Sequence, residues 1–297
     1  MASFWRQWSH YARFALPFLL GQQDVPLILG LVVTDRCNLA CKDCRVANTG
    51  RSDMTFTQIQ EKLLSCYRRG FRELYIEGGE PFLWRDHDYR LDDVVEEARR
   101  IGFFHVHIYT NGHFPLQSRA DLLWVSVDGL RDHYARIRGD HFEKVRANIF
   151  ASPMQKKSIV YTVNQLNRDH IEVFLRTVAQ DKWPVAGVMF YFHTPYYGID
   201  ELFIPAKERS SIIDELIQHK QKGLPVYNSI SGLRLLQSGN WRRPSRTYAI
   251  IDQDGEYLCC RYNRPEICRE CGYGACTEVA AAQQWHVDAW RNLAGFL

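Results

Sequence analysis

The middle of this 297-residue chain lacks cysteine, since none occurs between positions 67 and 258. Apart from Cys66, the nine cysteines form two tight clusters near opposite ends of the chain. A disulfide scaffold is typical of short secreted chains in which cysteines are spread throughout. The pattern therefore argues against a disulfide framework and favours metal or iron–sulfur ligands in a reducing cytosol.

An excess of one charge sign is also missing, because 37 Lys and Arg residues face 34 Asp and Glu residues. The net charge of +3 gives no reason to expect a nucleic-acid partner. The sequence contains no internal repeat and no low-complexity tract. Its length suits one large domain with an appendage.

The N-terminus has neither an apolar run long enough to cross a membrane nor a clear small-residue cleavage site for a signal peptide. Aromatic side chains recur at helical spacing within residues 4–18, which predicts an amphipathic helix. Such a helix either packs against the body of the protein or makes peripheral membrane contact. We therefore expect a cytoplasmic protein, with membrane association as the alternative that this helix leaves open.

From Pro26 onward, strand patterns alternate with helical ones. Strands are expected at 27–34, 73–76, 105–109, 122–127, 158–163 and 185–192. Repeated βαβ units predict an α/β fold with right-handed crossovers. An eight-stranded barrel needs about 250 residues, so a partial (β/α)6 barrel fits better. A long helix at about 205–222 and a loop-rich, cysteine-rich tail after Trp241 are expected to follow.

The first cysteine cluster has the spacing C-x3-C-x2-C and directly follows the first strand. Cys37, Cys41 and Cys44 would supply three thiolates, whereas a closed [4Fe–4S] site uses four. One iron would therefore stay open to chelate a ligand. Taken alone, this motif has an alternative interpretation: the three cysteines form a zinc knot or are unrelated thiols.

Further polar motifs follow the later strands. The residues concerned are Gly78, Gly79, Glu80, Asn111, Ser126, Asp128 and Asn164. Because the carboxyl ends of parallel strands meet at one mouth of a barrel, these groups are expected near the three cysteines. Glu77, just before the glycines, either binds substrate or tunes the chemistry at this mouth, or is a buried carboxylate held by a backbone donor or a nearby arginine.

With these motifs together, residues 27–200 resemble the radical S-adenosylmethionine (SAM) superfamily. The resemblance implies that Cys37, Cys41 and Cys44 hold the catalytic [4Fe–4S] cluster. It implies that Gly78, Gly79 and Glu80 contact the methionine amino group of SAM. Ser126 and Asp128 would contact the ribose or the carboxylate of SAM. Asn111 and Asn164 would make further polar contacts. The chain departs from the superfamily at Asp43, where an aromatic residue usually helps to seat the adenine.

The second cluster follows a Gly-x4-Cys turn that ends at Cys260. The tail resembles the twitch or SPASM type of auxiliary-cluster extension, which implies a second [4Fe–4S] cluster on Cys260, Cys268, Cys271 and Cys276. A zinc knuckle on the same residues is the alternative, and Cys259 stands beside the set without an assigned role. We expect three parts: an N-terminal helix and lead-in segment at 1–26, the barrel at 27–200, and a helix with the cysteine-rich extension at 201–297.

The resemblance implies an enzyme. A low-potential electron donor of the flavodoxin or ferredoxin type would reduce the cluster, which cleaves SAM to methionine and a 5′-deoxyadenosyl radical that attacks an unreactive carbon. The substrate is expected to be a lipid or isoprenoid, or another small molecule, and the layout after the sixth strand loosely resembles the adenosylhopene transferase type. A peptide-modifying SPASM-type maturase is one alternative. A non-enzymatic iron–sulfur or zinc protein that only binds partners is another.

Changing Cys37, Cys41 and Cys44 together to alanine is expected to abolish formation of 5′-deoxyadenosine, because the cluster that reduces SAM loses its protein ligands. The measurement is chromatography of the products after anaerobic reconstitution and reduction, with the unchanged chain as the control. Undiminished turnover in the triple variant would contradict the assignment.

Overall fold

The computed structural model describes residues 9, 11–12, 25–243, 246–260 and 264–296. Most of the predicted amphipathic helix at 4–18 therefore lies outside the described residues. The three-part division at residues 26 and 200 also stays a prediction. No helix among the described residues combines the length and the apolar character needed to span a membrane.

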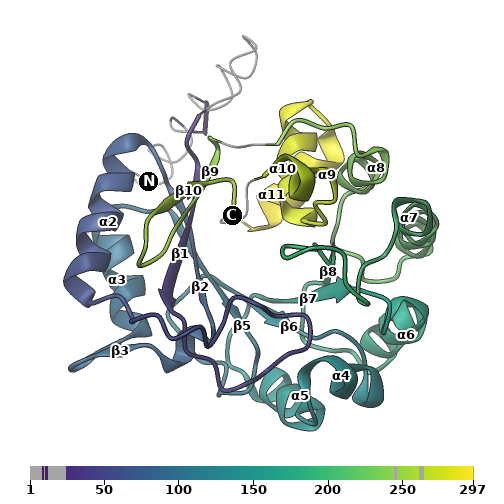
Figure 1. Cartoon of the computed structure of the whole chain (residues 1–297), viewed down its shortest axis with the longest axis horizontal. Coiled ribbons are helices and arrows are strands. Elements are labelled where there is room, and N and C mark those ends of the chain that lie inside the picture. Colours follow the sequence, from purple (N-terminus) through teal and green to yellow (C-terminus); the bar gives the residue numbers. More distant parts are fainter. Residues whose placement is uncertain (1–8, 10, 13–24, 244–245, 261–263, 297) are drawn as a thin grey trace.

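Six parallel strands form the body of the protein (Figure 1). In spatial order they are β1 (Ile28–Thr34), β2 (Glu73–Gly78), β5 (His105–Thr110), β6 (Leu122–Ser126), β7 (Lys157–Val163) and β8 (Val188–Phe192). Each strand pairs with the next in parallel register. This confirms the predicted partial (β/α)6 barrel, and every predicted strand overlaps an observed one.

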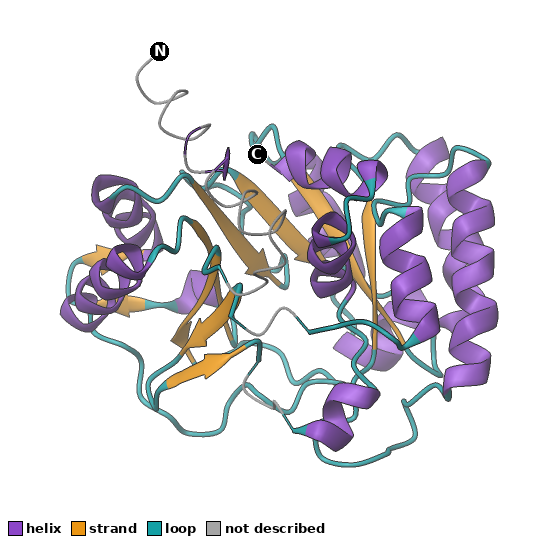
Figure 2. Ribbon diagram, turned by 90° about the horizontal axis from the view of Figure 1, so that it is seen from above, coloured by secondary structure: helices purple, strands orange, loops and turns teal. Residues whose placement is uncertain are grey.

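Helices flank the strands on two sides (Figure 2). They are α2 (Phe56–Arg69), α3 (Leu91–Ile101), α4 (Arg131–Arg138), α5 (Phe142–Ala151), α6 (Ile171–Gln180) and α7 (Ala206–Gln221), with short 3-10 turns at Pro81–Leu83 and Arg168–His170 and a small hairpin of β3 (Arg85–Asp86) and β4 (Tyr89–Arg90). Side chains alternate along β2, where Leu74 and Ile76 join the core under the helices. Tyr75 and Glu77 face the barrel interior instead and line a cavity there.

The tail is not loop-rich, so that expectation was wrong. It follows α8 (Ile230–Ser238) and contains β9 (Tyr248–Ile251), β10 (Glu256–Leu258), α9 (Pro265–Arg269), α10 (Gly274–Gln283) and α11 (Val287–Phe296). Nearly all of α10 is buried, so it lacks the apolar and polar faces by which a helix is recognised in a sequence. The strands are short and are stabilised by the barrel, because β9 pairs with the outer edge of β1.

The same tail also covers the opposite edge of the barrel. The amide of Phe192 in β8 donates to the Gly272 carbonyl at 2.8 Å. A Cβ at position 272 would lie 2.0 Å from the Phe192 carbonyl oxygen, so only glycine allows this approach. Next to it, the Asn228 side chain accepts from the Phe190 amide at 2.7 Å and donates to the Phe190 carbonyl at 3.1 Å. The tail thus bridges β1 and β8 and closes the gap in the barrel (Figure 1).

The Asn228→Ala substitution is expected to lower the free energy of unfolding by about 2 kcal/mol, because it leaves a buried N–H and a buried C=O of β8 without partners. That corresponds to a fall of roughly 4 °C in the thermal midpoint for a chain of this size. Calorimetry or thermal melting would measure it. The exposed Asn240→Ala variant is the control, and equal midpoints for the two variants would refute the bridging role.

Candidate active site

A cavity of about 470 Å³ occupies the barrel interior. Side chains from all six parallel strands and from the tail line it. Cysteines of both clusters reach this one space: Cys37, Cys41, Cys44, Cys259, Cys260, Cys271 and Cys276. The two sequence motifs, more than two hundred residues apart in the chain, therefore belong to one site.

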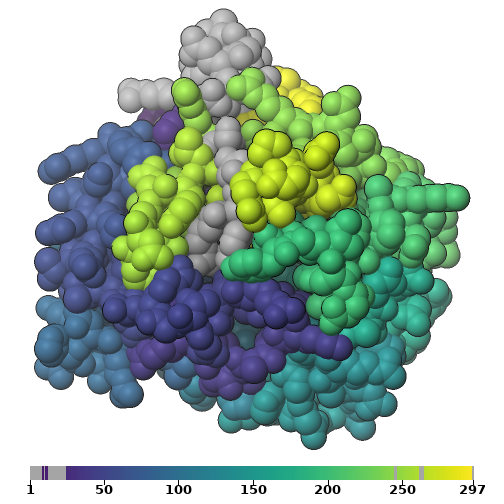
Figure 3. Space-filling model, in the orientation of Figure 1, coloured from purple at the N-terminus to yellow at the C-terminus, as the bar shows by residue number. Residues whose placement is uncertain are grey.

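The loop that carries the first three cysteines follows β1 and is anchored at several points. The Cys37 amide donates to the Asn48 side chain at 2.8 Å, and the Lys42 amide donates to the carbonyl of Ile137 in α4 at 2.8 Å. Arg51 forms an ion pair of 3.1 Å with Asp252, just after β9. Figure 3 shows this loop across the open face of the barrel, in contact with the β9–β10 hairpin and the segment after β8.

The surroundings of these sulfur atoms suit thiolates. The Cys37 sulfur accepts from the Leu39 amide at 3.4 Å and lies 3.7 Å from the Asn111 side-chain amide. The Cys41 sulfur lies 3.8 Å from a guanidinium nitrogen of Arg138. Burial raises the pKa of the Cys41 thiol to about 12, so a bound metal has to displace its proton.

Within the described ranges, no three or more Cys, His, Asp or Glu side chains are grouped as for a single metal ion. Three thiols with N–H donors and a cation nearby nevertheless suit a [4Fe–4S] cluster in which one iron stays open. The residues present therefore fit that group.

Gly78 and Gly79 bring the end of β2 against the start of the cysteine loop. The Gly79 amide donates to the Thr34 carbonyl at 2.9 Å, and the Glu80 amide donates to the Arg36 carbonyl at 2.8 Å. A Cβ would lie 2.4 Å from the Thr34 oxygen at position 78 and 2.3 Å from the Arg36 oxygen at position 79. Both glycines line the cavity, so their backbone is exposed to a ligand there.

Glu80 is fully buried, and its carboxylate joins the ends of β2 and β5. It accepts hydrogen bonds from the Thr110 hydroxyl at 2.9 Å, the Asn111 amide at 2.7 Å and the Phe82 amide at 3.1 Å. Burial raises the pKa of this carboxyl to about 7. Through these bonds Glu80 positions Asn111 beside Cys37; its contact with the SAM amino group stays a prediction.

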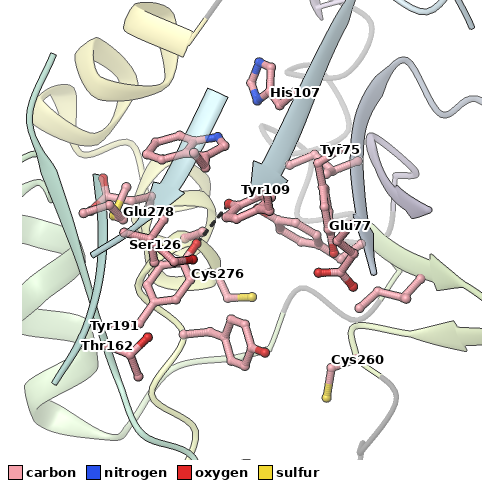
Figure 4. A pocket seen from close by; sticks show the side chains of 18 of the residues that line it. Tyr75, Glu77, His107, Tyr109, Ser126, Thr162, Tyr191, Cys260, Cys276 and Glu278 are labelled. Carbon is pink, nitrogen blue, oxygen red and sulfur yellow. Dashed lines mark hydrogen bonds between the residues drawn. The ribbon is translucent and has the colours of Figure 1, made fainter. Parts of the chain in front are cut away.

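Ser126, Asp128 and Asn164 are placed at different depths. Ser126 lines the cavity, as Figure 4 shows. Asp128 and Asn164 are fully buried. Asn164 binds backbone groups of its own turn, including the Leu166 amide at 2.9 Å. Of these three predicted SAM contacts, one is a cavity residue and two support the wall around the cavity; their contacts with SAM stay predictions.

Arg138, which no sequence pattern singled out, connects Asp128 to the first cysteine cluster. Its guanidinium lies 2.5 Å from the Asp128 carboxylate, which also accepts from the Thr162 amide at 2.6 Å. Burial raises the pKa of Asp128, and the adjacent Arg138 opposes part of that rise. An arginine in the last turn of a helix is common, so the sequence contained no signal for it.

The centre of the cavity is aromatic. The hydroxyls of Tyr109 and Tyr191 lie 3.1 Å apart, and the Tyr75 ring packs edge-on against Tyr109. Burial raises the pKa of each of these three phenols, so they stay neutral. Figure 4 shows Glu77, Tyr109, Tyr191 and Cys276 around the same space.

Sequence comparison agrees with this arrangement. Residues 31–178 match the radical SAM superfamily. The chain belongs to that superfamily. Its members are enzymes that use a [4Fe–4S] cluster and SAM, which confirms the predicted catalytic cluster and SAM; the auxiliary cluster stays a prediction.

Individual relatives match only parts of the chain, at low sequence identity. The chain is 36% identical over 98 residues to a probable GTP 3′,8-cyclase of Methanopyrus kandleri and 29% identical over 212 residues to the GTP 3′,8-cyclase of Lactiplantibacillus plantarum. These matches cover 32% and 60% of this chain, and they span only 30% and 60% of the relatives' own lengths. Among solved structures, anSMEcpe with bound AdoMet and the Kp18Cys peptide has a TM-score of 0.63 at 15% identity, covering 89% of this chain and 81% of that one. This likeness shows the fold.

The Gly79→Ala substitution is expected to reduce iron loading by at least about half, because the new methyl group displaces the backbone that leads to Cys37. Iron per chain after anaerobic reconstitution is the measurement. Gly255→Ala is the matched control, since a Cβ there meets no atom within 4 Å. Full iron loading in Gly79→Ala would show that the close approach is dispensable.

Proposed function

We propose that this radical SAM enzyme modifies an unreactive carbon of a lipid- or isoprenoid-class molecule whose apolar body lies in the barrel interior. The observation that carries the proposal is the lining of the cavity. It runs from the cysteines at the carboxyl ends of the strands to Leu27 and Glu73 at their amino ends, and much of its wall is apolar or aromatic. Representative lining residues are Ile28, Tyr75, Trp124, Met189, Tyr248 and Leu293.

The charges in the cavity do not suit a nucleoside triphosphate, although the curated relatives above are named GTP cyclases. A triphosphate needs several cations, usually arginine or lysine. Of the described residues that line the cavity, only Arg45 and Arg138 are arginine or lysine. Arg138 is already paired with Asp128.

Four carboxylates line the same space: Asp43, Glu73, Glu77 and Glu278. Glu73 pairs with His105 at 3.1 Å, and Glu278 accepts from the Ser229 amide at 2.7 Å. Binding an apolar substrate with few polar groups in this cavity therefore costs less free energy than binding a polyanion.

A peptide-modifying role has weaker support. The solved structure with a bound peptide shares the fold at 15% identity, which carries no argument about substrate. Here the tail occupies the gap between β1 and β8, so the substrate space is the enclosed interior of the barrel.

The chain's own residues would divide the work as follows. Cys37, Cys41 and Cys44 would hold the [4Fe–4S] cluster, which with SAM supplies the 5′-deoxyadenosyl radical. Arg138 would hold positive charge beside Cys41, and Gly78 with Gly79 would present backbone to SAM. Glu77 and the Tyr109–Tyr191 pair would orient the polar end of the substrate, while the apolar wall excludes water from the radical. A flavodoxin- or ferredoxin-type donor would supply the electron.

Farnesol is a suitable isoprenoid probe. It is expected to bind the reconstituted protein and change the fluorescence of Trp124 in the cavity wall. Ala282→Phe narrows the cavity and should weaken this binding at least about tenfold, or about 1.4 kcal/mol. Ala151→Phe adds the same volume at an exposed position and serves as the control. Binding of GTP in preference to farnesol, or equal farnesol binding by both variants, would refute the proposed substrate class.

A further inference from the structure

The tail contains two adjacent cysteines, of which the sequence motif selects the second. Counting Gly-x4-Cys from Gly255 leads to Cys260. The fold distinguishes the two thiols in another way, because both follow the end of β10 (Glu256–Leu258) and the backbone turns at Cys259. The turn after β10 therefore decides which thiol joins the other tail cysteines.

Cys259 lies close to the other tail thiols. Its amide donates to the Tyr248 carbonyl at 3.0 Å, which fixes it to β9. Its backbone has φ of 69°, in the left-handed region that residues other than glycine rarely adopt. The Cys259 and Cys276 side chains are hydrogen-bonded to each other. Cys259 also lies within electrostatic range of Cys268 and of Cys271.

Arg243 provides a second, independent indication. Its guanidinium donates to the Cys268 carbonyl and stacks on Trp241 at 3.8 Å. It lies within electrostatic range of Cys259, Cys268 and Cys271. Its Nε is buried and has no hydrogen-bond partner among the described residues. A buried N–H donor of a cation that lies close to several thiols suits a negatively charged metal–thiolate centre.

Cys260 also has aromatic neighbours. It lines the barrel cavity, as Cys259 does, and its electrostatic contacts include Tyr196, Tyr273 and Cys276. In Figure 4 its thiol points away from Cys276. This thiol therefore faces the space that also holds Cys37, Cys41 and Cys44.

We propose that Cys259, together with Cys268, Cys271 and Cys276, holds the tail metal centre, and that Cys260 is a cavity-facing thiol outside the ligand set. This deepens the proposed function, on which it rests, by naming the ligands of the auxiliary site. Arg243 then acts as a positioning residue that holds positive charge beside the sulfurs. The site would take an iron–sulfur cluster, with four protein thiolates and no open iron.

The test uses the full chain in the Cys37, Cys41 and Cys44 to Ala background, so that only tail metal is counted. The parent should hold about four irons per chain after reconstitution. Cys259→Ala should lose at least half of this iron and its cluster absorbance, whereas the neighbouring Cys260→Ala should keep both. Loss confined to Cys260→Ala, equal retention in both variants, or a parent without tail metal would overturn the proposal.

A second measurement covers the case in which both variants lose metal by misfolding. The metal-loaded parent is treated with iodoacetamide, digested and sequenced by mass spectrometry. Alkylation of Cys260 with protection of Cys259 supports the proposal, and the opposite pattern overturns it. Formation of 5′-deoxyadenosine by the chain with intact Cys37, Cys41 and Cys44 is measured in parallel, so failure of the tail assignment is distinguished from failure of the radical SAM chemistry.

Discussion

The architecture depends on covering the two edge strands of the barrel. A barrel of six parallel strands cannot close on itself at this size, so β1 and β8 would each leave a row of N–H and C=O groups without partners. The tail satisfies both rows, through β9 on one side and through Gly272 with Asn228 on the other. Because it has to span this gap, it also brings its own cysteines to the cavity that the first cysteines reach.

The first cysteine loop depends on close contacts with the neighbouring strands. Close approach at Gly78 and Gly79 seats the loop on β2, and the buried Glu80 carboxylate joins that strand end to Asn111. Behind the wall, Asp128 holds Arg138 against Cys41. Charged groups without a partner would be costly at this depth, so each is fixed by several hydrogen bonds. These hydrogen bonds position the site without a bound ligand.

Much of the barrel could be predicted because its strands are buried on both faces and read as continuous apolar runs, as at 27–34. The first cysteine motif and the glycines could be predicted because they are contiguous and follow strand ends. The position of Arg138 depends on the register of α4 against a distant loop, which has no local signature. The same holds for α10, whose alanine-rich sequence shows no amphipathic pattern when it is buried on all sides.

The depth of Asp128 was not predictable either. Its place at a strand end indicates a ligand contact, but the strand twist and the neighbouring Thr162 amide decide that the carboxylate faces the wall. For the tail, the spacing from Gly255 selects Cys260, whereas the left-handed turn at Cys259 depends on pairing with Tyr248. Both cases are tertiary effects on single side chains.

The ion pair between Arg51 and Asp252 has a consequence for biosynthesis. The two residues are 201 positions apart, and at ordinary translation rates of 5–20 residues per second the ribosome needs about 10–40 s to make the chain between them. During that interval the cysteine loop exists without this anchor, and β1 without its outer neighbour. A cysteine loop anchored to Asp252 therefore exists only after the chain has been synthesised beyond that residue.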